Sequence, residues 1–138
     1  MRSPRRLNVV GRPLNLAVRW RRRVASHMAE WHHCWRCKKS VPMLDEGEWA
    51  QIEPLLQRQV RAVQRYREQH GCSLHEALMA VPTLEAQDRI YELTGYVEPN
   101  ANAIWHHRLS RYGPPCRACG YLLRTRRASR CANCGVAT

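Results

Sequence analysis

Six of the seven cysteines form three Cys-x-x-Cys pairs, a spacing that lets two thiolates bind one metal ion. The pairs are Cys34/Cys37, Cys116/Cys119 and Cys131/Cys134. In a chain without an export signal, thiols at this spacing indicate metal ligands rather than a disulfide framework. Each of the last two pairs is followed by glycine, which permits the tight turn of a metal-binding knuckle. We therefore predict that these four cysteines bind one zinc ion.

The predicted zinc site is closed. Eleven residues separate Cys119 from Cys131, enough for an out-and-back hairpin that brings the two pairs together, with Tyr121, Leu122 and Leu123 covering the site. Zinc suits four thiolates in a tetrahedron, and such a site leaves no position for water, so the ion would be structural rather than catalytic. Two disulfides, or iron bound as in rubredoxin, are the alternatives for these four cysteines.

Residues 115–135 resemble the zinc-ribbon family through their two Cys-x-x-Cys-Gly knuckles. The resemblance implies a small fold and a metal, and it implies no substrate. Residues 31–135 are also similar to small bacterial zinc-ribbon proteins of unknown role, some of which accompany toxins as antidotes. This wider similarity favours a partner-binding protein.

The first pair, Cys34/Cys37, allows two interpretations. A thioredoxin-type motif needs a helix that begins at the second cysteine, and a c-type haem site needs a histidine directly after it, whereas Lys38 follows here. A second zinc site and a free dithiol remain. The histidines that can complete such a site lie either beside the pair or far along the chain, namely His32, His33, His106 and His107.

A long helix is expected to begin after Asp45, which can form a capping box with Glu48. Apolar residues at steps of three and four predict one buried helical face, formed by Trp49, Ile52, Leu56, Val60 and Val63. Pro54 predicts a kink or two abutting helices, and Gly71 predicts the end of the helix.

Three shorter helices are expected downstream. The first covers Leu74–Met79; the second is capped by Thr83, ends at Gly95 and turns Leu84, Ile90 and Leu93 inward; the third covers Ala101–Arg111. Pro114 and Pro115 then form a hinge.

These patterns predict a mainly α protein with a small C-terminal zinc-ribbon β-hairpin, in the α+β class. The expected parts are a basic extension at 1–27, a small helical domain with the first Cys-x-x-Cys knuckle at 28–112, and the zinc ribbon at 113–138. The extension contains eight arginines and no acid. It is interpreted as a nucleic-acid-binding arm, as a targeting presequence or, preferably, as sequence upstream of a true start at Met28.

Charge is divided along the chain, whose formal net charge is +12. Residues 40–100 have a net charge of −5, and residues 101–138 have +7. The ribbon arginines make nucleic-acid binding the alternative function, through Arg117, Arg124, Arg126, Arg127 and Arg130. From Met28 the net charge is +4, and a four-thiolate zinc site lowers it to about +2, which is modest for a nucleic-acid binder.

A protein-interaction role is therefore the preferred expectation. The tryptophans at 31, 35, 49 and 105 offer large apolar anchors for an interface, although core packing is their ordinary use. The sequence contains no HExxH, GxSxG or phosphate-binding glycine loop, so no enzyme activity is expected. Charges interrupt every apolar stretch, and a cytoplasmic location is expected.

Overall fold

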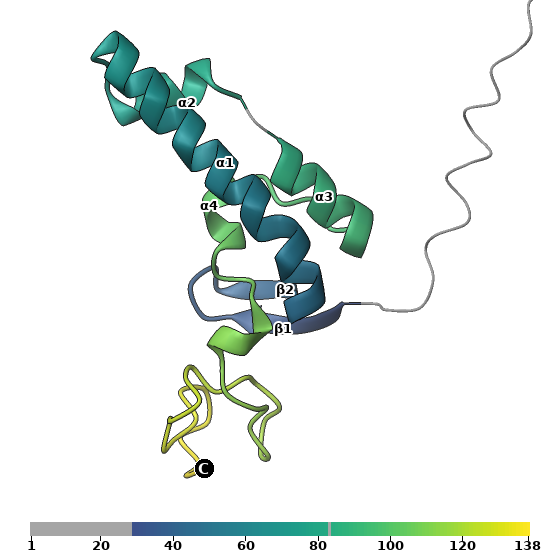
Figure 1. Cartoon of the computed structure of the whole chain (residues 1–138). Helices are drawn as coiled ribbons and strands as arrows, with labels where there is room; N and C mark the ends of the chain where they lie inside the picture. The colour runs from purple at the N-terminus through teal and green to yellow at the C-terminus, as the bar shows by residue number, and fades with distance from the viewer. Residues whose placement is uncertain (1–28, 83) are drawn as a thin grey trace, which may run out of the picture.

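The structure, a computed structural model, describes residues 29–82 and 84–138. The elements, in chain order, are β1 (Glu30–Cys34), β2 (Lys39–Met43), α1 (Glu46–His70), α2 (Leu74–Ala80), α3 (Glu85–Thr94), α4 (Ala101–Ile104) and the short 3-10 helix η3 (Leu109–Arg111). Figure 1 shows α1 as the longest element, with β1 and β2 at one end of it and α2 at the other. The expected extension at 1–27 lies outside the described residues, and the expected boundary between 28–112 and 113–138 stays a prediction.

The two strands form an antiparallel hairpin that ends at the first cysteine pair. Cys34 is paired with Lys39 across the hairpin, and the Lys38 amide donates to the Cys34 carbonyl at 2.8 Å. Lys38 has a φ of 55°, the left-handed conformation that closes this turn. The turn therefore places Cys34 and Cys37 together at one end of the hairpin.

Helix α1 begins and ends where its local signals predict. The Glu48 amide donates to the Asp45 side chain at 2.8 Å, and the Glu48 carboxylate accepts from the Asp45 amide at 3.0 Å, completing the capping box. Gly71 ends the helix in the left-handed conformation, with a φ of 58°. Pro54 lies inside the helix, and α1 is one continuous helix rather than the two abutting helices that were one of our expectations. The hydrogen bonds on either side of the proline outweigh the single one that it removes.

The buried face of α1 differs from the expected one at a single position. Trp49, Ile52, Leu56 and Val63 are buried, whereas Val60 is 42% exposed. Leu44, Ala86, Ile90 and Ile104 complete this core with three of the α1 residues, and α2 and α3 pack against α1. Because α2 is only seven residues long, it covers little of the second half of α1, and Val60 stays uncovered.

Helix α3 begins later than predicted. Its N-terminal cap is Leu84, which is 58% exposed and not buried as expected, and the predicted cap Thr83 lies outside the described residues. Ile90 is buried as expected, Leu93 is partly buried against the core, and Gly95 ends the helix with a φ of 73°.

The helix expected at Ala101–Arg111 is far shorter, and this expectation was wrong. Helix α4 stops at Ile104, because the backbone after it pairs with Leu44 instead of continuing in helical hydrogen bonds. The Leu44 amide donates to the His107 carbonyl at 2.7 Å, and the Leu109 amide donates to the Leu44 carbonyl at 2.9 Å. This pairing holds the turn after α4 against the end of β2.

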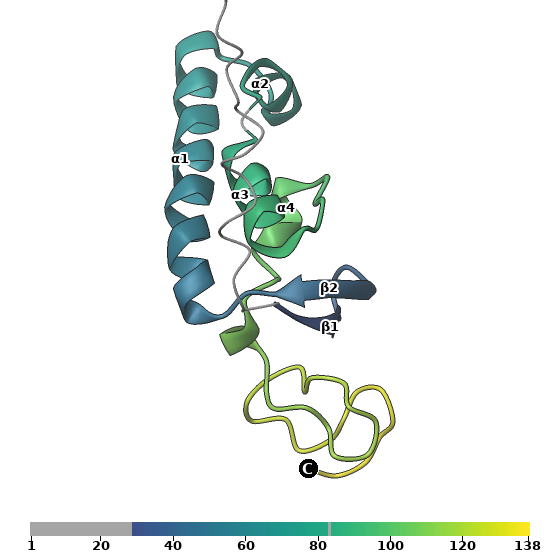
Figure 2. The same ribbon diagram turned by 90° about the vertical axis from the view of Figure 1, so that its right-hand side faces the viewer.

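The position of the β-hairpin was also predicted wrongly. Among the described residues the two-stranded sheet is the N-terminal β1–β2 hairpin, and the C-terminal module has only the isolated bridges Pro115–Leu122 and Arg130–Ala137. The glycine after each C-terminal cysteine pair has a positive φ, which turns each knuckle back on itself before a long hairpin can form. The mixed helix and sheet content still fits a small α+β protein. Figure 2 shows the C-terminal module beyond the hairpin, at the end opposite α2.

No helix in residues 29–82 and 84–138 combines the length and the apolar character required to cross a bilayer.

The junction between η3 and the C-terminal module contains Gly113, where a side chain has no room. A Cβ atom there would lie 2.5 Å from the Thr125 carbonyl oxygen and 2.8 Å from the Leu123 Cβ. We predict that Gly113→Ala lowers the free energy of unfolding by about 1–3 kcal/mol, because the backbone must shift to accept it. Chemical denaturation measures the change. Gly47→Ala is the control, since its Cβ would meet only Asp45 Oδ1 at 3.4 Å, and equal effects of the two substitutions would contradict the prediction.

Candidate metal centre

The structure brings all four C-terminal cysteines together. The sulfur atoms of Cys116, Cys119, Cys131 and Cys134 all lie within 4.8 Å of one another. Two of these separations are 3.7 Å, between Cys116 and Cys134, and 3.5 Å, between Cys119 and Cys131. A tetrahedral zinc with Zn–S bonds of about 2.3 Å requires sulfur separations of about 3.8 Å. The cluster therefore has the size and the donor set to hold a metal ion, and it fits zinc.

Two short turns position the four sulfur atoms. The Gly120 amide donates to the Cys116 carbonyl at 2.8 Å, and the Gly135 amide donates to the Cys131 carbonyl at 2.9 Å. Both glycines have positive φ, 79° and 75°. The repeated Cys-x-x-Cys-Gly pattern thus makes two similar knuckles, and a metal ion between them would replace the strand pairing that the module lacks.

Backbone amides favour the thiolate form of two ligands. A hydrogen bond from the Tyr121 amide, supported by the Asn133 side chain, lowers the pKa of Cys119 to about 6. The amides of Cys119 and Ala118 lower the pKa of Cys116 in the same way. Because metals bind the thiolate and not the thiol, these donors prepare the cluster for a cation.

The two leucines expected to cover the sulfur cluster pack in two different places. Leu123 packs against the sulfur cluster with Cys116 and Cys131, as expected. Leu122 instead packs into the β1–β2 hairpin beside Val41, and its carbonyl accepts a 2.9 Å hydrogen bond from Trp35 Nε1. The two leucines therefore fasten the C-terminal module to the hairpin.

Tyr121 points away from the cluster and lies flat on the His33 ring. Their centroids are 4.9 Å apart with an interplanar angle of 9°, and Trp35 meets Tyr121 edge-on at 5.8 Å. Arg124 lies 5.6 Å from the centre of the Trp35 ring. The five arginines of the nucleic-acid alternative, Arg117, Arg124, Arg126, Arg127 and Arg130, are all exposed.

The first cysteine pair meets histidines from far along the chain. Ligand atoms of Cys34, Cys37 and His106 lie within 4.8 Å of one another, and His107 Nε2 lies 3.4 Å from the Cys37 sulfur. The local histidines are placed elsewhere. His32 Nε2 lies 3.1 Å from the Glu30 carboxylate, and His33 stacks on Tyr121, so neither belongs to this group.

Burial sets the charge state of this second group. Desolvation raises the pKa of Cys37 to about 11 and lowers the pKa of His107 to about 4, with the neighbouring His106 and Lys39 adding to the second effect. Desolvation also lowers the pKa of His106. Without a cation, Cys37 is a neutral thiol beside the neutral imidazoles of His106 and His107. Neutral imidazole is the form that binds metals.

Two residues beside this group were not singled out in the sequence. Glu98 is 2% exposed, and Tyr112 donates to the His106 carbonyl at 2.7 Å while its hydroxyl lies 3.7 Å from the Cys34 sulfur. No motif spacing marks either residue, since Glu98 lies in the segment before α4 and Tyr112 follows η3, both far along the chain from Cys34 and Cys37.

No known protein family matches the chain, and no curated protein or solved structure shows significant similarity to it. The case for the metal centre therefore depends on the geometry of the cysteines.

Replacing Cys131 by serine should remove one bound zinc ion per chain, because a buried ligand of the four-thiolate cluster is lost. Elemental mass spectrometry of the purified protein gives the stoichiometry. Cys72→Ser is the matched control, because Cys72 belongs to neither of the cysteine groups in the described chain. An unchanged zinc content in Cys131→Ser would refute the assignment.

Proposed function

We propose that the chain is a non-enzymatic, zinc-stabilised protein-binding module that receives an acidic amphipathic helix of another protein in an apolar groove beside α1. One observation carries this proposal: the groove is lined by apolar side chains, and the fold leaves Val60, Leu74 and Leu78 among them exposed. Its residues come from α1, α2 and the region around α4.

The groove has a volume of about 200 Å³. Its apolar lining consists of Leu56, Val60, Val63, Leu74, Leu78 and Trp105. Val60 is 42% exposed, Leu74 52% and Leu78 40%. Apolar side chains gathered in a groove between helices favour the insertion of an amphipathic helix, whose side chains at spacings of three and four would fill it.

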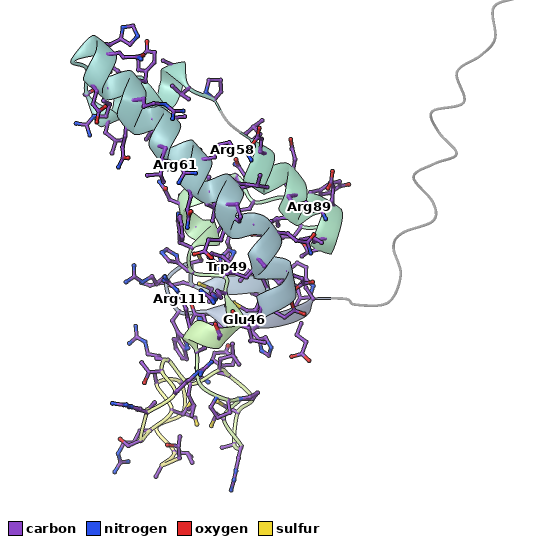
Figure 3. The ribbon with its side chains drawn as sticks, in the orientation of Figure 1. Glu46, Trp49, Arg58, Arg61, Arg89 and Arg111 are labelled. Atoms are coloured by element: carbon purple, nitrogen blue, oxygen red, sulfur yellow. The ribbon has the colours of Figure 1, made fainter. Side chains whose placement is uncertain are left out.

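Charge along α1 supports an acidic partner. The first half of the helix contains Glu46, Glu48 and Glu53, whereas the second half contains four arginines against Glu68, and one of these arginines, Arg67, lines the groove. Arg58 is engaged by Glu85 at 2.9 Å, whereas within the described part of the chain no carboxylate lies within 4.0 Å of Arg67, so its charge is available to an acidic side chain of the partner. Figure 3 shows Arg58 and Arg61 on the middle of α1, away from Glu46 at its start.

The tryptophans divide between core and groove. Trp49 is buried in the core, where it meets Trp105 edge-to-face at 5.9 Å between ring centroids. Trp105 is half-buried and lines the groove, so it serves both the core and the proposed interface. Trp35 is used inside the protein, through its hydrogen bond to Leu122, and Trp31 is 51% exposed beside Tyr96.

Zinc has a structural role in this proposal. Four thiolates fill the coordination shell of the C-terminal ion, so no position remains for a substrate or an activated water. Free thiols of this kind suit a reducing compartment, and we place the protein in the cytoplasm.

Nucleic-acid binding is the second candidate, and the exposure of all five ribbon arginines favours it. Stacking of a base on Tyr121 would support this candidate, but the ring of His33 already covers one face of Tyr121. Counted from Met28, the net charge of about +2 after one zinc ion is bound gives little long-range attraction for a phosphate backbone.

A library of displayed helical peptides with varied acidic content tests the proposal on the zinc-loaded protein. We expect selection of helices with an apolar stripe and flanking acids. Val60→Asp should weaken their binding at least about tenfold, since it places a charge in the groove. Val97→Asp is the control, because Val97 is 69% exposed and lies outside the groove lining. Failure to select any such helix, or equal binding by both variants, would argue against the groove.

The same protein is measured against duplex and single-stranded DNA and RNA at near-physiological salt. The proposal expects no binding at micromolar concentration. Binding that falls steeply with salt and is lost on replacing Arg124, Arg126 and Arg127 by glutamine would establish the nucleic-acid alternative instead.

A further inference from the structure

We propose that Cys34, Cys37, His106 and His107 form a second, mixed-ligand zinc site, and that Glu98 is its positioning residue through the ring of His107. This site is independent of the proposed protein-binding groove. It joins the turn of the β1–β2 hairpin to the turn after α4, two segments about 70 residues apart in the sequence.

Ligand atoms of Cys34, Cys37 and His106 lie within 4.8 Å of one another, and the distances from the Cys37 sulfur to both imidazoles suit a tetrahedral ion. His107 lies outside this group of three and would complete the four-ligand set by a small approach. The Cys37 sulfur lies 3.9 Å from His106 Nδ1 and 3.4 Å from His107 Nε2. Zn–S bonds of about 2.3 Å and Zn–N bonds of about 2.0–2.1 Å require sulfur–nitrogen separations of about 3.6 Å, which lies between these two values. The Cys37 amide also donates to the Cys34 sulfur at 3.4 Å, as in a metal-binding knuckle.

Adjacent histidines can reach one ion here because they use different ring nitrogens. His106 presents Nδ1 and His107 presents Nε2 to the Cys37 sulfur. The backbone between them is held on both sides, since the Tyr112 hydroxyl donates to the His106 carbonyl at 2.7 Å and the Leu44 amide donates to the His107 carbonyl at 2.7 Å. The same pairing that ends α4 early therefore turns both imidazoles towards the cysteines.

Glu98 supplies an observation that points to a cation independently of the sulfur atoms. The residue is 2% exposed, and its Oε2 has no hydrogen-bond partner within the described residues. This oxygen lies 3.9 Å from His107 Nδ1 and 3.9 Å from Lys39 Nζ. A buried carboxylate oxygen without a partner is costly, so the protein gains by providing one.

A metal ion on His107 Nε2 would provide that partner. Coordination fixes the hydrogen on Nδ1 and makes it a stronger donor, and a small approach brings it into hydrogen-bond range of Glu98, as in carboxylate–histidine–zinc arrangements. The charges also balance, because two thiolates and the Glu98 carboxylate together offset zinc and the Lys39 ammonium.

The competing arrangement has three protein ligands, Cys34, Cys37 and His106, with water in the fourth position. His107 argues against it, since its ring is 1% exposed and its Nε2 lies closer to the Cys37 sulfur than His106 Nδ1 does. A closed site makes this second ion structural, like the first.

Elemental analysis and zinc K-edge X-ray absorption of the full-length protein test the ligand set without any substitution. We expect two zinc ions per chain and, averaged over both sites, about three sulfur and one nitrogen ligand per ion. One zinc ion with sulfur ligands only would overturn the site. Two zinc ions, with one imidazole and one water molecule instead of two imidazoles at the second site, would overturn the assignment of His107.

Variants then locate the second ion. Cys34→Ser with Cys37→Ser should lower the content by one ion and leave a pure four-sulfur spectrum, whereas Cys72→Ser should change neither measurement. Unchanged zinc content in the double variant would contradict the proposal.

Glu98→Gln tests the positioning role, because it keeps the shape of the side chain and removes its charge. We expect the affinity for the second zinc to fall about 10–100-fold, measured by competition with a chelator, while the first ion stays bound. Glu68→Gln, an exposed carboxylate on α1, is the matched control. Equal affinities in the two variants would remove Glu98 from the site.

Discussion

The clustering of four cysteine sulfurs is the constraint on which the C-terminal module depends. Residues 113–138 contain no helix and no strand, only two isolated bridges, and the buried cluster there consists of Leu123 with Cys116 and Cys131. So little apolar burial cannot offset the conformational entropy of ordering the chain. A zinc ion held by the four thiolates would supply the missing free energy, because the binding energy of a structural metal becomes folding energy.

Two neighbouring leucines connect this module to the rest of the protein. Leu123 packs on the sulfur cluster, whereas Leu122 enters the hydrophobic cluster of the hairpin beside Cys34 and accepts the Trp35 hydrogen bond. Figures 1 and 2 show the result, a helical half and a cysteine-rich module on either side of one small sheet. The groove lies on the helical half, away from the cysteine cluster of the C-terminal module.

Sequence reasoning succeeded where the signal was local. The capping box at Asp45, the glycine ends of α1 and α3 and the knuckle spacing of the C-terminal cysteines depend on residues within a few positions of one another. It failed where distant segments decide the structure. Helix α4 is cut short by Leu44, about 60 residues earlier, and the exposure of Val60 follows from the short reach of α2. The meeting of Cys37 with His106 arises from the same long-range pairing, and Glu98 is buried beside Lys39 and His107, which are distant in the sequence. Only the three-dimensional structure could therefore select these residues from the available histidines and acids.

Amide hydrogen exchange on the full-length protein, with zinc bound and after its removal by a chelator, tests the central claim most directly. The account predicts that amides of residues 113–138, including the Gly120 and Gly135 amides that close the knuckles, lose protection when zinc is removed. Protection in the middle of α1, around Ile52 and Leu56, should persist, because that core consists of apolar side chains. Unchanged protection of the C-terminal module after complete removal of zinc would contradict the claim that the metal holds it together.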